Sequence, residues 1–365
     1  MRTWLLVVLL TSPSRPQAAD YPEPTQGDFS IRDFRFASGE TLPDLRIHYR
    51  TLGAPRRGDD GEVRNAVLIL HGTTGGGAGF LRPEFAGELL GAGQPLDASR
   101  YFVILPDGIG HGGSGKPSDG LRGRFPRYRY RDMIEAQHRL LTDGLKVDHL
   151  RLVMGTSMGG MHTWLWGEQH PEFMEVWRRA ITDVIRQDAR WEGGEYRDQP
   201  PSLRTAAEMF SFLLNSSAQR QKEGPTREAA DRALDEEAAR FIKASDANDV
   251  LYAVEASKDC GPGLETIRAA LLAINSEDDL INPPELGILE REIGRVRRGK
   301  AIVIPRSDRT RGHRTHSIAA IWKDHLVEML KRSDRWSPAT AETSRARPAG
   351  SWASADRPSL PNPDE

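Results

Sequence analysis

The chain has 365 residues, 38% of them hydrophobic, and a formal net charge of −2 at pH 7. This length accommodates one large core, or a core domain with an inserted lid. Basic and acidic residues are interspersed, without the one-sided clustering that binding to a phosphate backbone requires, so nucleic acid is excluded as a partner. The single cysteine, Cys260, cannot form an intramolecular disulfide, and no Cys/His spacing typical of a zinc site occurs.

The two ends of the chain differ from the middle. Residues 1–19 are typical of an export signal, because Arg2 precedes an apolar run and small residues stand at Ala18 and Ala19. An uncleaved anchor or a misassigned start is the alternative. No later stretch reaches the length of about 20 apolar residues that spans a bilayer, so we expect no membrane span in the mature chain. Residues 333–365, rich in Pro, Ala, Ser and Arg, are predicted to be a disordered tail.

Strand and helix signals alternate over residues 20–190, the first part of the predicted core. Two strands are expected at 29–36 and 45–52, and short apolar runs typical of buried parallel strands follow at 66–70, 101–105 and 150–154. Helical spacing separates these runs at 132–142 and 158–169. The alternation predicts an α/β fold with a mostly parallel sheet covered by helices on both faces.

The alternation stops between residues 191 and 262, where the sequence is polar and mostly helical. We interpret residues 191–262 as a helical lid, with its strongest helix signal at 228–242. The core pattern resumes over 263–332, with apolar runs at 269–274 and 300–304, a helix starting near Pro283 and a last helix at 317–330.

The segment "VMGTSMGGM" places Ser157 between glycines, at the end of a buried strand and directly before a helix. A Gly-x-Ser-x-Gly sequence in this context is typical of a nucleophile elbow, a strained turn that exposes the serine hydroxyl. The same turn directs the amide of Met158 at a carbonyl under attack, so Met158 is predicted to be one oxyanion donor. A glycine-rich turn that arose by chance is the alternative.

A serine hydroxyl needs a base to take its proton and an acid to orient that base. Asp279 follows the apolar run 269–274 in "INSEDDLINPP", in a loop at the carboxyl end of a strand, where active sites of open parallel sheets gather. We therefore predict Asp279 as the acid, with the neighbouring Asp278 and Glu277 left open as alternatives.

The base is predicted in the loop after the apolar run 300–304, in "IPRSDRTRGHRTHS". His313 is preferred because Gly312 before it allows close approach, and His316 is the alternative. Any surface loop can hold a histidine or an aspartate, so the prediction depends on the strand ends that precede both loops.

His71 opens the sequence "LHGTTGGG" directly after the run 66–70. The glycines suggest backbone amides that face a ligand, as in the loop that supplies the second oxyanion donor, and we predict Thr73 as that donor with Thr74 as the alternative. Phosphate binding by this loop is disfavoured because the Gly-Lys-Ser/Thr ending of a P-loop is missing, and no cofactor is predicted.

The chain resembles the α/β-hydrolase superfamily and, within it, the branch of homoserine O-acetyltransferases and their hydrolase relatives. The resemblance rests on "VLILHGTTG", "LRLVMGTSMGGMHTWLWGEQHPEFM", "DANDVLYA", "INSEDDLINPPEL" and "RGH", and extends from about residue 29 to 330. It implies an α/β-hydrolase fold with a helical lid and a triad of Ser157, Asp279 and His313.

Two departures from that branch affect the interpretation. The acetyltransferases carry a glycine- and serine-rich segment after the strand near Pro106, whereas this chain has "PDGIGHGGSGKPSDG", which is more similar to esterases. A further buried strand is also expected after the elbow helix, yet residues 171–190 show a helical pattern. We expect the loss of this strand to leave a gap in the sheet or to force the neighbouring strands together. Either change could displace Asp279.

The function expected is that of a serine hydrolase that cleaves a small ester or related acyl substrate through an acyl-enzyme. An exported protein would not meet acetyl-CoA, so acetyl transfer to homoserine is the second hypothesis. A binding-only or inactive relative is the third hypothesis, because of the missing strand. A small-molecule acyl substrate is the expected partner; the sequence determines neither its identity nor the oligomeric state.

Overall fold

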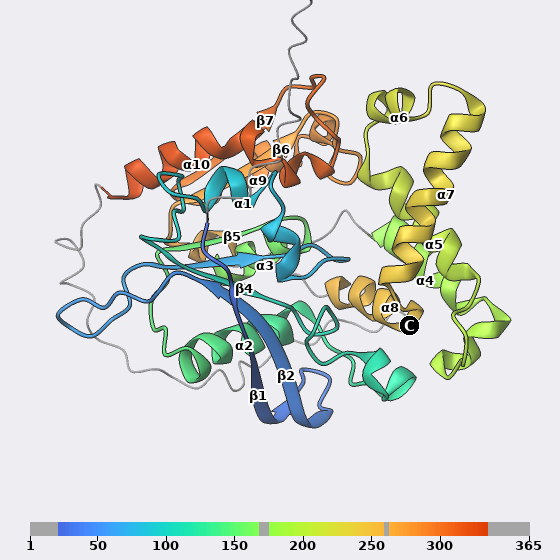
Figure 1. Cartoon of the computed structure of the whole chain (residues 1–365), viewed down its shortest axis with the longest axis horizontal. Helices are drawn as coiled ribbons and strands as arrows, with labels where there is room; N and C mark the ends of the chain where they lie inside the picture. The colour runs from blue at the N-terminus through green and yellow to red at the C-terminus, as the bar shows by residue number, and fades with distance from the viewer. Residues whose placement is uncertain (1–20, 168–174, 259–262, 335–365) are drawn as a thin grey trace, which may run out of the picture.

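The computed structural model describes residues 21–167, 175–258 and 263–334 (Figure 1). The predicted export signal, Cys260 and the predicted tail from residue 335 onward lie outside these ranges. Within the ranges, none of the helices combines the length and the apolar character that crossing a bilayer requires.

Five strands form one sheet in the order β1-β2-β4-β3-β5. Their bounds are β1 Thr25–Arg35, β2 Thr41–Leu52, β3 Ala66–Leu70, β4 Phe102–Pro106 and β5 Leu152–Gly155. β3 runs parallel to both β4 and β5, whereas β1 and β2 are antiparallel to their neighbours. The three short apolar runs are thus the parallel strands, and every residue of β3 and β4 is buried.

Helices cover both faces of this sheet: α1 Ala86–Leu89, α2 Tyr130–Arg139, α3 Met158–Gly167 and α10 Ala319–Asp334. Alternate residues of β3 face opposite sides, so that Val67 and Ile69 share a hydrophobic cluster with α1 and α10. Leu68 belongs instead to a cluster with Trp166 of α3. This alternation is what a strand buried on both faces requires, and it confirms the predicted α/β architecture.

The strand expected after α3 is missing from the described residues, as the helical pattern predicted. α4 (Glu175–Arg186) lies in that part of the sequence. β6 (Leu271–Ser276) and β7 (Gly299–Ile304) pair in parallel as a separate two-stranded sheet. Of the two predicted consequences, the gap is therefore the one observed.

Hydrophobic side chains bridge the gap between the two sheets. Leu152 of β5 and Trp322 of α10 are buried in one cluster, and Met154, Ile274 and Ile302 from β5, β6 and β7 pack against it. Packing rather than backbone hydrogen bonding therefore joins the two sheets, because β5 and β6 share no ladder within the described residues.

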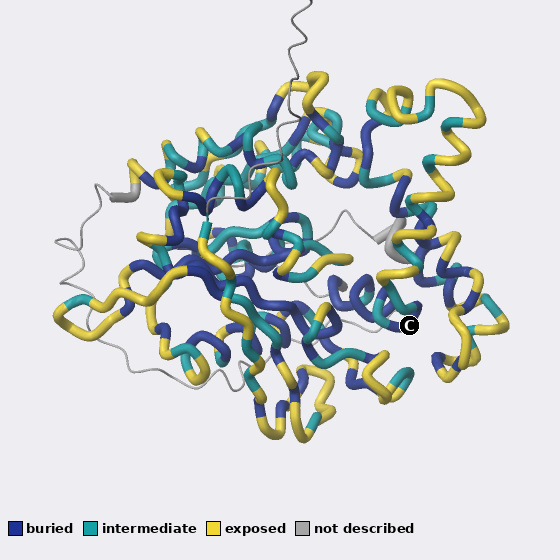
Figure 2. The backbone as a smooth tube through the Cα atoms, in the orientation of Figure 1, coloured by how far each residue is buried: buried dark blue, intermediate teal, exposed yellow. Residues whose placement is uncertain are grey.

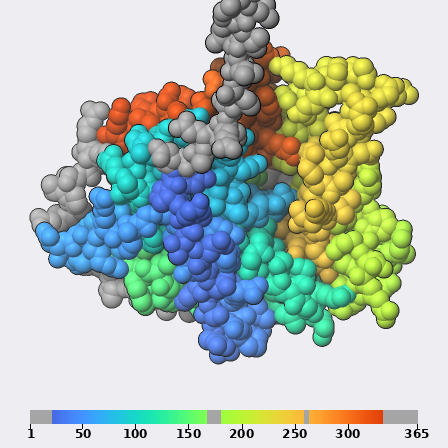
Figure 3. Space-filling model, viewed as in Figure 1, coloured from blue at the N-terminus to red at the C-terminus, as the bar shows by residue number. Residues whose placement is uncertain are grey.

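Helices also form most of the region between the two parts of the core: α5 Ser202–Leu214, α6 Ser217–Glu223, α7 Arg227–Ala244 and α8 Ala247–Glu255. Three of them begin at side-chain caps, since Ser216, Thr226 and Asp246 each accept hydrogen bonds from amides of the first turn. Figure 3 shows α6 and α7 at the edge of the molecule, beside the C-terminal elements. Figure 2 shows buried residues in the central strands, whereas much of β1 and β2 is exposed. A short helix, α9 (Ile288–Ile293), connects β6 to β7.

Candidate active site

Ser157 lies on a strained turn between β5 and α3. Its φ is +54°, in the left-handed region that residues other than glycine rarely adopt. β5 ends at Gly155 and α3 begins at Met158, so only Thr156 and Ser157 form the turn. Such a conformation costs about 1–3 kcal/mol and persists only where the surroundings enforce it.

Two glycines of the turn are required by close packing. A Cβ on Gly159 would lie 1.9 Å from the carbonyl oxygen of Leu70, and one on Gly155 would lie 2.0 Å from the carbonyl oxygen of Gly159. No side chain fits at either position. The first turn of α3 therefore contacts the end of β3 directly, and this contact fixes the backbone of Ser157.

Asp279 lies in the loop that follows β6, and its side chain is 5% exposed. Its Oδ1 accepts hydrogen bonds from the amides of Ile281 (2.7 Å) and Asn282 (3.0 Å), and its Oδ2 lies 2.8 Å from Nδ1 of His313. Burial raises the pKa of Asp279, but the neighbouring imidazole and the two amides outweigh burial, and the net pKa is below the ordinary value. The carboxylate is therefore ionised at neutral pH.

His313 lies between this carboxylate and the serine. Its Nε2 is 2.9 Å from Oγ of Ser157, and its side chain is 5% exposed. Gly312 before it has a φ of +60°, and a Cβ there would lie 2.7 Å from the amide of Ser216. The structure thus brings together Ser157, His313 and Asp279, and the gap in the sheet has not displaced Asp279.

The alternatives considered for the acid and the base do not contact Ser157 or His313 in the same way. Asp278 faces away from the imidazole, because its carboxylate accepts hydrogen bonds from Ser276, from Oγ1 of Thr310 (3.0 Å) and from the amide of Gly312 (3.2 Å). Asp278 therefore anchors the loop that carries His313. The ring of His316 lies 5.2 Å from that of His313, and burial, followed by the electrostatic interaction with that second imidazole, lowers the pKa of His316 to about 3. Glu277 accepts from the amide of Arg306.

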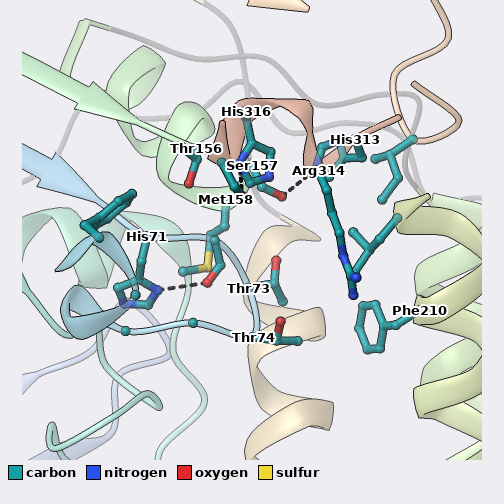
Figure 4. Close-up of a pocket in the computed structure, with 18 of the residues that line it drawn as sticks. His71, Thr73, Thr74, Thr156, Ser157, Met158, Phe210, His313, Arg314 and His316 are labelled. Carbon is teal, nitrogen blue, oxygen red and sulfur yellow. Dashed lines mark hydrogen bonds between the residues drawn. The ribbon is translucent and has the colours of Figure 1, made fainter. Parts of the chain in front are cut away.

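The loop after β3 faces the same cavity as Ser157. His71 Nε2 accepts a hydrogen bond from the amide of Gly108 (2.9 Å), so its Nδ1 carries the hydrogen and donates to the carbonyl of Gly72 (2.8 Å; Figure 4). In a trans peptide the carbonyl of one residue and the amide of the next point in opposite directions. This bond therefore turns the amide of Thr73 away from His71. Neither that amide nor the amide of Met158 donates to another group of the described chain.

A second buried imidazole, His111, holds the next peptide of this loop. Its Nε2 lies 2.6 Å from the carbonyl of Thr73, and its Nδ1 lies 2.9 Å from the carbonyl of Ile109. Burial lowers the pKa of His111, so the ring is neutral and one nitrogen carries the hydrogen. With the hydrogen on Nε2, the ring donates to the carbonyl of Thr73. By the same peptide geometry, this bond turns the amide of Thr74 away from His111.

A cavity of about 680 Å³ opens in front of Ser157. Figure 4 shows Ser157 and His313 along one side of it, with Thr73 and Thr74 on the opposite side. Apolar side chains of α5, including Phe210 and Leu214, complete the wall. In the described ranges, His, Cys, Asp and Glu side chains nowhere gather in the groups of three or more that would hold a metal ion.

The sequence analysis missed His111 and the network behind it. The carboxylate of Asp107 is buried, accepts from the amides of Gly77 (2.6 Å) and Gly113 (2.9 Å), and contacts Arg50 at 3.3 Å. Asp107, His111 and Gly113 belong to the segment "PDGIGHGGSGKPSDG", which was interpreted above only by its similarity to esterases. The signal that could have identified His111 is a histidine inside a glycine-rich loop at the carboxyl end of a central strand.

The strained serine, its imidazole and carboxylate, and the mostly parallel sheet define an α/β-hydrolase fold. A model of the family described as "alpha/beta hydrolase fold" matches residues 65–285. The chain belongs to this family, and it is an enzyme of the ester hydrolase or O-acyltransferase kind.

Named relatives place the chain near the acyltransferases of this family. It is 29% identical over 277 residues to the "Probable acyltransferase" of Methanothermobacter thermautotrophicus. The aligned region covers 71% of this chain and 84% of that protein. It is 31% identical to the homoserine O-acetyltransferase of Natronomonas pharaonis, and the aligned region covers 69% of this chain and 77% of that protein. The resemblance to this branch is confirmed.

A solved structure supports the fold. An acetylester hydrolase from Corynebacterium glutamicum superimposes with a TM-score of 0.71 over 84% of this chain and 96% of that one. At 20% sequence identity the similarity shows the shared fold alone.

Proposed function

We propose that the protein is a serine hydrolase that cleaves a small ester through an acyl-enzyme. The observation that carries the proposal is the unbroken chain of contacts from Oγ of Ser157 through His313 to Asp279, at 2.9 and 2.8 Å. Both distances are within the range in which a base can take the proton of a nucleophile and an acid can orient that base.

The first half of the reaction forms the acyl-enzyme. Oγ of Ser157 attacks the carbonyl carbon of the ester while its proton moves to Nε2 of His313. The carbonyl oxygen becomes negative and accepts hydrogen bonds from the amides of Thr73 and Met158, which have no other acceptor in the described chain. Asp279 stabilises the imidazolium that forms. His313 then gives its proton to the leaving alcohol as the bond between carbon and alcohol oxygen breaks.

The second half regenerates the serine. His313 takes a proton from a water molecule, the hydroxide attacks the acyl carbon, and the carboxylic acid leaves as Ser157 regains its proton. An alcohol in place of water would give acyl transfer by the same steps. The choice between hydrolysis and transfer therefore depends on what the cavity admits.

Acetyl transfer to homoserine is the second candidate, and the name of the Natronomonas pharaonis relative favours it. We rank hydrolysis first because residues 1–19 are typical of an export signal, and acetyl-CoA would be absent outside the cell. A mature protein that begins after Ala19 would support this ranking, and a protein retained in the cytoplasm would reverse it.

Labelling with a fluorophosphonate probe tests the proposal. The probe should form a covalent adduct with Ser157, located by mass spectrometry, and the Ser157→Ala variant should remain unlabelled. That variant should also lose about 10⁶-fold in kcat, as nucleophile deletions do in serine hydrolases. A folded wild-type protein that resists the probe would contradict the proposal and leave the binding-only hypothesis.

Two assays then separate hydrolysis from transfer. The first follows p-nitrophenyl acetate, and the second follows acetyl-CoA in the presence of homoserine. We expect turnover in the first assay and none above background in the second.

A further inference from the structure

The cavity in front of Ser157 is lined by more positive than negative groups. Arg82, Arg311 and Arg314 line it, and among the described residues Glu84 is the only acidic residue in the lining. A partly enclosed site with an excess of one charge concentrates ligands of the opposite charge. The cavity therefore favours an anion close to the serine.

Arg314 is the arginine whose position is best defined. It directly follows His313, and Figure 4 shows its side chain extending from beside His313 to Phe210 of α5. Its Nη2 donates to Glu237 of α7, a residue that is not part of the described lining. The contact with Glu237 thus fixes the guanidinium, and 44% of the Arg314 side chain remains exposed.

Glu237 neutralises Arg314 only in part. Its other carboxylate oxygen accepts from Oγ of Ser211 (2.6 Å) and from Nη2 of Arg220 (2.8 Å), and Arg220 also reaches Glu223 at 3.6 Å. Glu237 is thus shared by Arg220 and Arg314, and Glu223 is a second carboxylate partner of Arg220 alone. The contact with Glu237 engages one nitrogen of Arg314, whereas a guanidinium has five N–H donors.

The other two arginines contact neutral acceptors. Nη1 of Arg311 donates to the carbonyl oxygens of Asp308 and Thr310, both at 2.9 Å, and Nε of Arg82 donates to the carbonyl oxygen of Gly79 at 3.0 Å. Asp308 is close enough to interact electrostatically with Arg311, but its carboxylate is paired with Lys222 at 2.8 Å. Carbonyl contacts orient a guanidinium and leave its charge available to a ligand.

We propose that the substrate carries a carboxylate in addition to the ester group, and that Arg314 and Arg311 select it. This inference rests on the proposed hydrolase function and specifies its substrate class. The triad cleaves the ester, and the arginines favour molecules whose acyl or alcohol part ends in an anion. Arginine suits this role because its planar donors match both oxygens of a carboxylate.

Matched pairs of esters test the proposal and locate the anion. For the acyl side, p-nitrophenyl hemiglutarate is compared with p-nitrophenyl valerate, in which a methyl group replaces the carboxylate. For the alcohol side, m-acetoxybenzoate is compared with m-tolyl acetate. Each kcat/KM is divided by the uncatalysed hydrolysis rate of the same ester. We expect at least one anionic ester to be preferred, by about tenfold, with a preference that falls as salt is added.

Variants connect this preference to the arginines. Arg314→Gln and Arg311→Gln should each lower the ratio of anionic to neutral kcat/KM by about three- to fivefold, as expected for a partly exposed ion pair. Arg314→Lys should retain part of the preference, because it keeps the charge but not the planar donors. Glu237→Gln should raise the ratio, since it removes the competing carboxylate. Arg240→Gln, on the exposed side of α7, is the matched control and should not change the ratio.

The outcomes distinguish this inference from the function on which it rests. If the neutral esters are cleaved and neither anionic ester is preferred, the carboxylate proposal is wrong and the hydrolase proposal stands. If no ester is cleaved, calorimetric titration with glutarate still tests the arginines. Binding that the Arg311→Gln/Arg314→Gln double variant does not weaken would overturn the carboxylate proposal in that case.

Discussion

The sheet that carries Ser157 and the sheet that carries Asp279 and His313 fix their side chains in different ways. At Ser157 the position depends on backbone packing, because β3 is fully buried and Gly159 contacts the carbonyl of Leu70 directly. β6 and β7 are only partly buried, and no ladder joins them to β5 within the described residues. In the loops after β6 and β7, hydrogen bonds of the side chains of Asp278 and Asp279 fix the position of His313.

This difference explains why Ser157, His313 and Asp279 remain in contact although a strand is missing from the described residues. β6 and β7 are paired in register up to Ser276 and Ile304, so the two loops that follow them leave the sheet side by side. Asp279 and His313 therefore move as one unit. The gap between β5 and β6 affects only the distance from that unit to Ser157, and the shared hydrophobic cluster maintains this distance.

The largest expected effect comes from breaking the unit formed by acid and base. In enzymes with a Ser-His-Asp triad, replacing the aspartate by asparagine stabilises the wrong imidazole tautomer and costs about 10⁴-fold in kcat. We expect a loss of this size for Asp279→Asn in assays with a p-nitrophenyl ester, with the circular dichroism spectrum unchanged.

Asp278→Asn is the matched control for that experiment. Asp278 anchors the loop through Gly312 and Thr310 and does not contact the imidazole, so its loss should cost about tenfold, equivalent to one hydrogen bond. Equal losses in the two variants would show that both aspartates act by holding the loop.

A second prediction tests the backbone packing at Ser157. Gly159→Ala places a Cβ 1.9 Å from the carbonyl of Leu70, so β3 and α3 must separate, and we expect the free energy of unfolding to fall by about 3 kcal/mol. At the neighbouring Gly160 the nearest atom would lie 3.6 Å away. Gly160→Ala should therefore be neutral or stabilise the helix by up to about 1 kcal/mol. Urea unfolding of both variants measures the difference, and similar midpoints would contradict the packing argument.

A third prediction concerns the imidazole that holds the oxyanion loop. His111→Phe removes the donor to the carbonyl of Thr73, which leaves this peptide free to rotate and should lower kcat about tenfold, less than the 10²–10³ that follows direct loss of an oxyanion donor. His111→Gln retains an N–H donor and should recover part of the rate. A change in KM alone, or an equal effect of the two variants, would show that His111 only fills space.

The sequence predicted the parts of the site that depend on local backbone, and not those that depend on contacts between separate loops. Ser157 was identifiable because a nucleophile elbow is local: glycine, serine and glycine lie within five residues between a strand and a helix. The loops of Asp279 and His313 were identifiable because they follow apolar strands. Asp279 was preferred, with Asp278 left open as an alternative, since adjacent side chains differ only in backbone direction. The contact of His111 with Thr73 joins two separate loops, and no local pattern encodes it.

The smallest expected effect lies where α8 contacts the short 3-10 turn Pro117–Asp119. Asp249 of α8 accepts hydrogen bonds from the amide (3.0 Å) and hydroxyl (2.6 Å) of Ser118, and burial raises its pKa from 3.8 to about 6. The folded state thus binds this proton more tightly than the unfolded state, so its contribution to stability is complete below pH 3.8 and is lost as the pH rises through 6. Asp249→Asn removes this dependence. We expect the Tm of the variant to exceed that of the wild type by up to about 2 °C at pH 8, and the two values to converge near pH 4. Parallel Tm curves between pH 4 and pH 8 would show that burial at the contact with Ser118 does not shift the titration of Asp249.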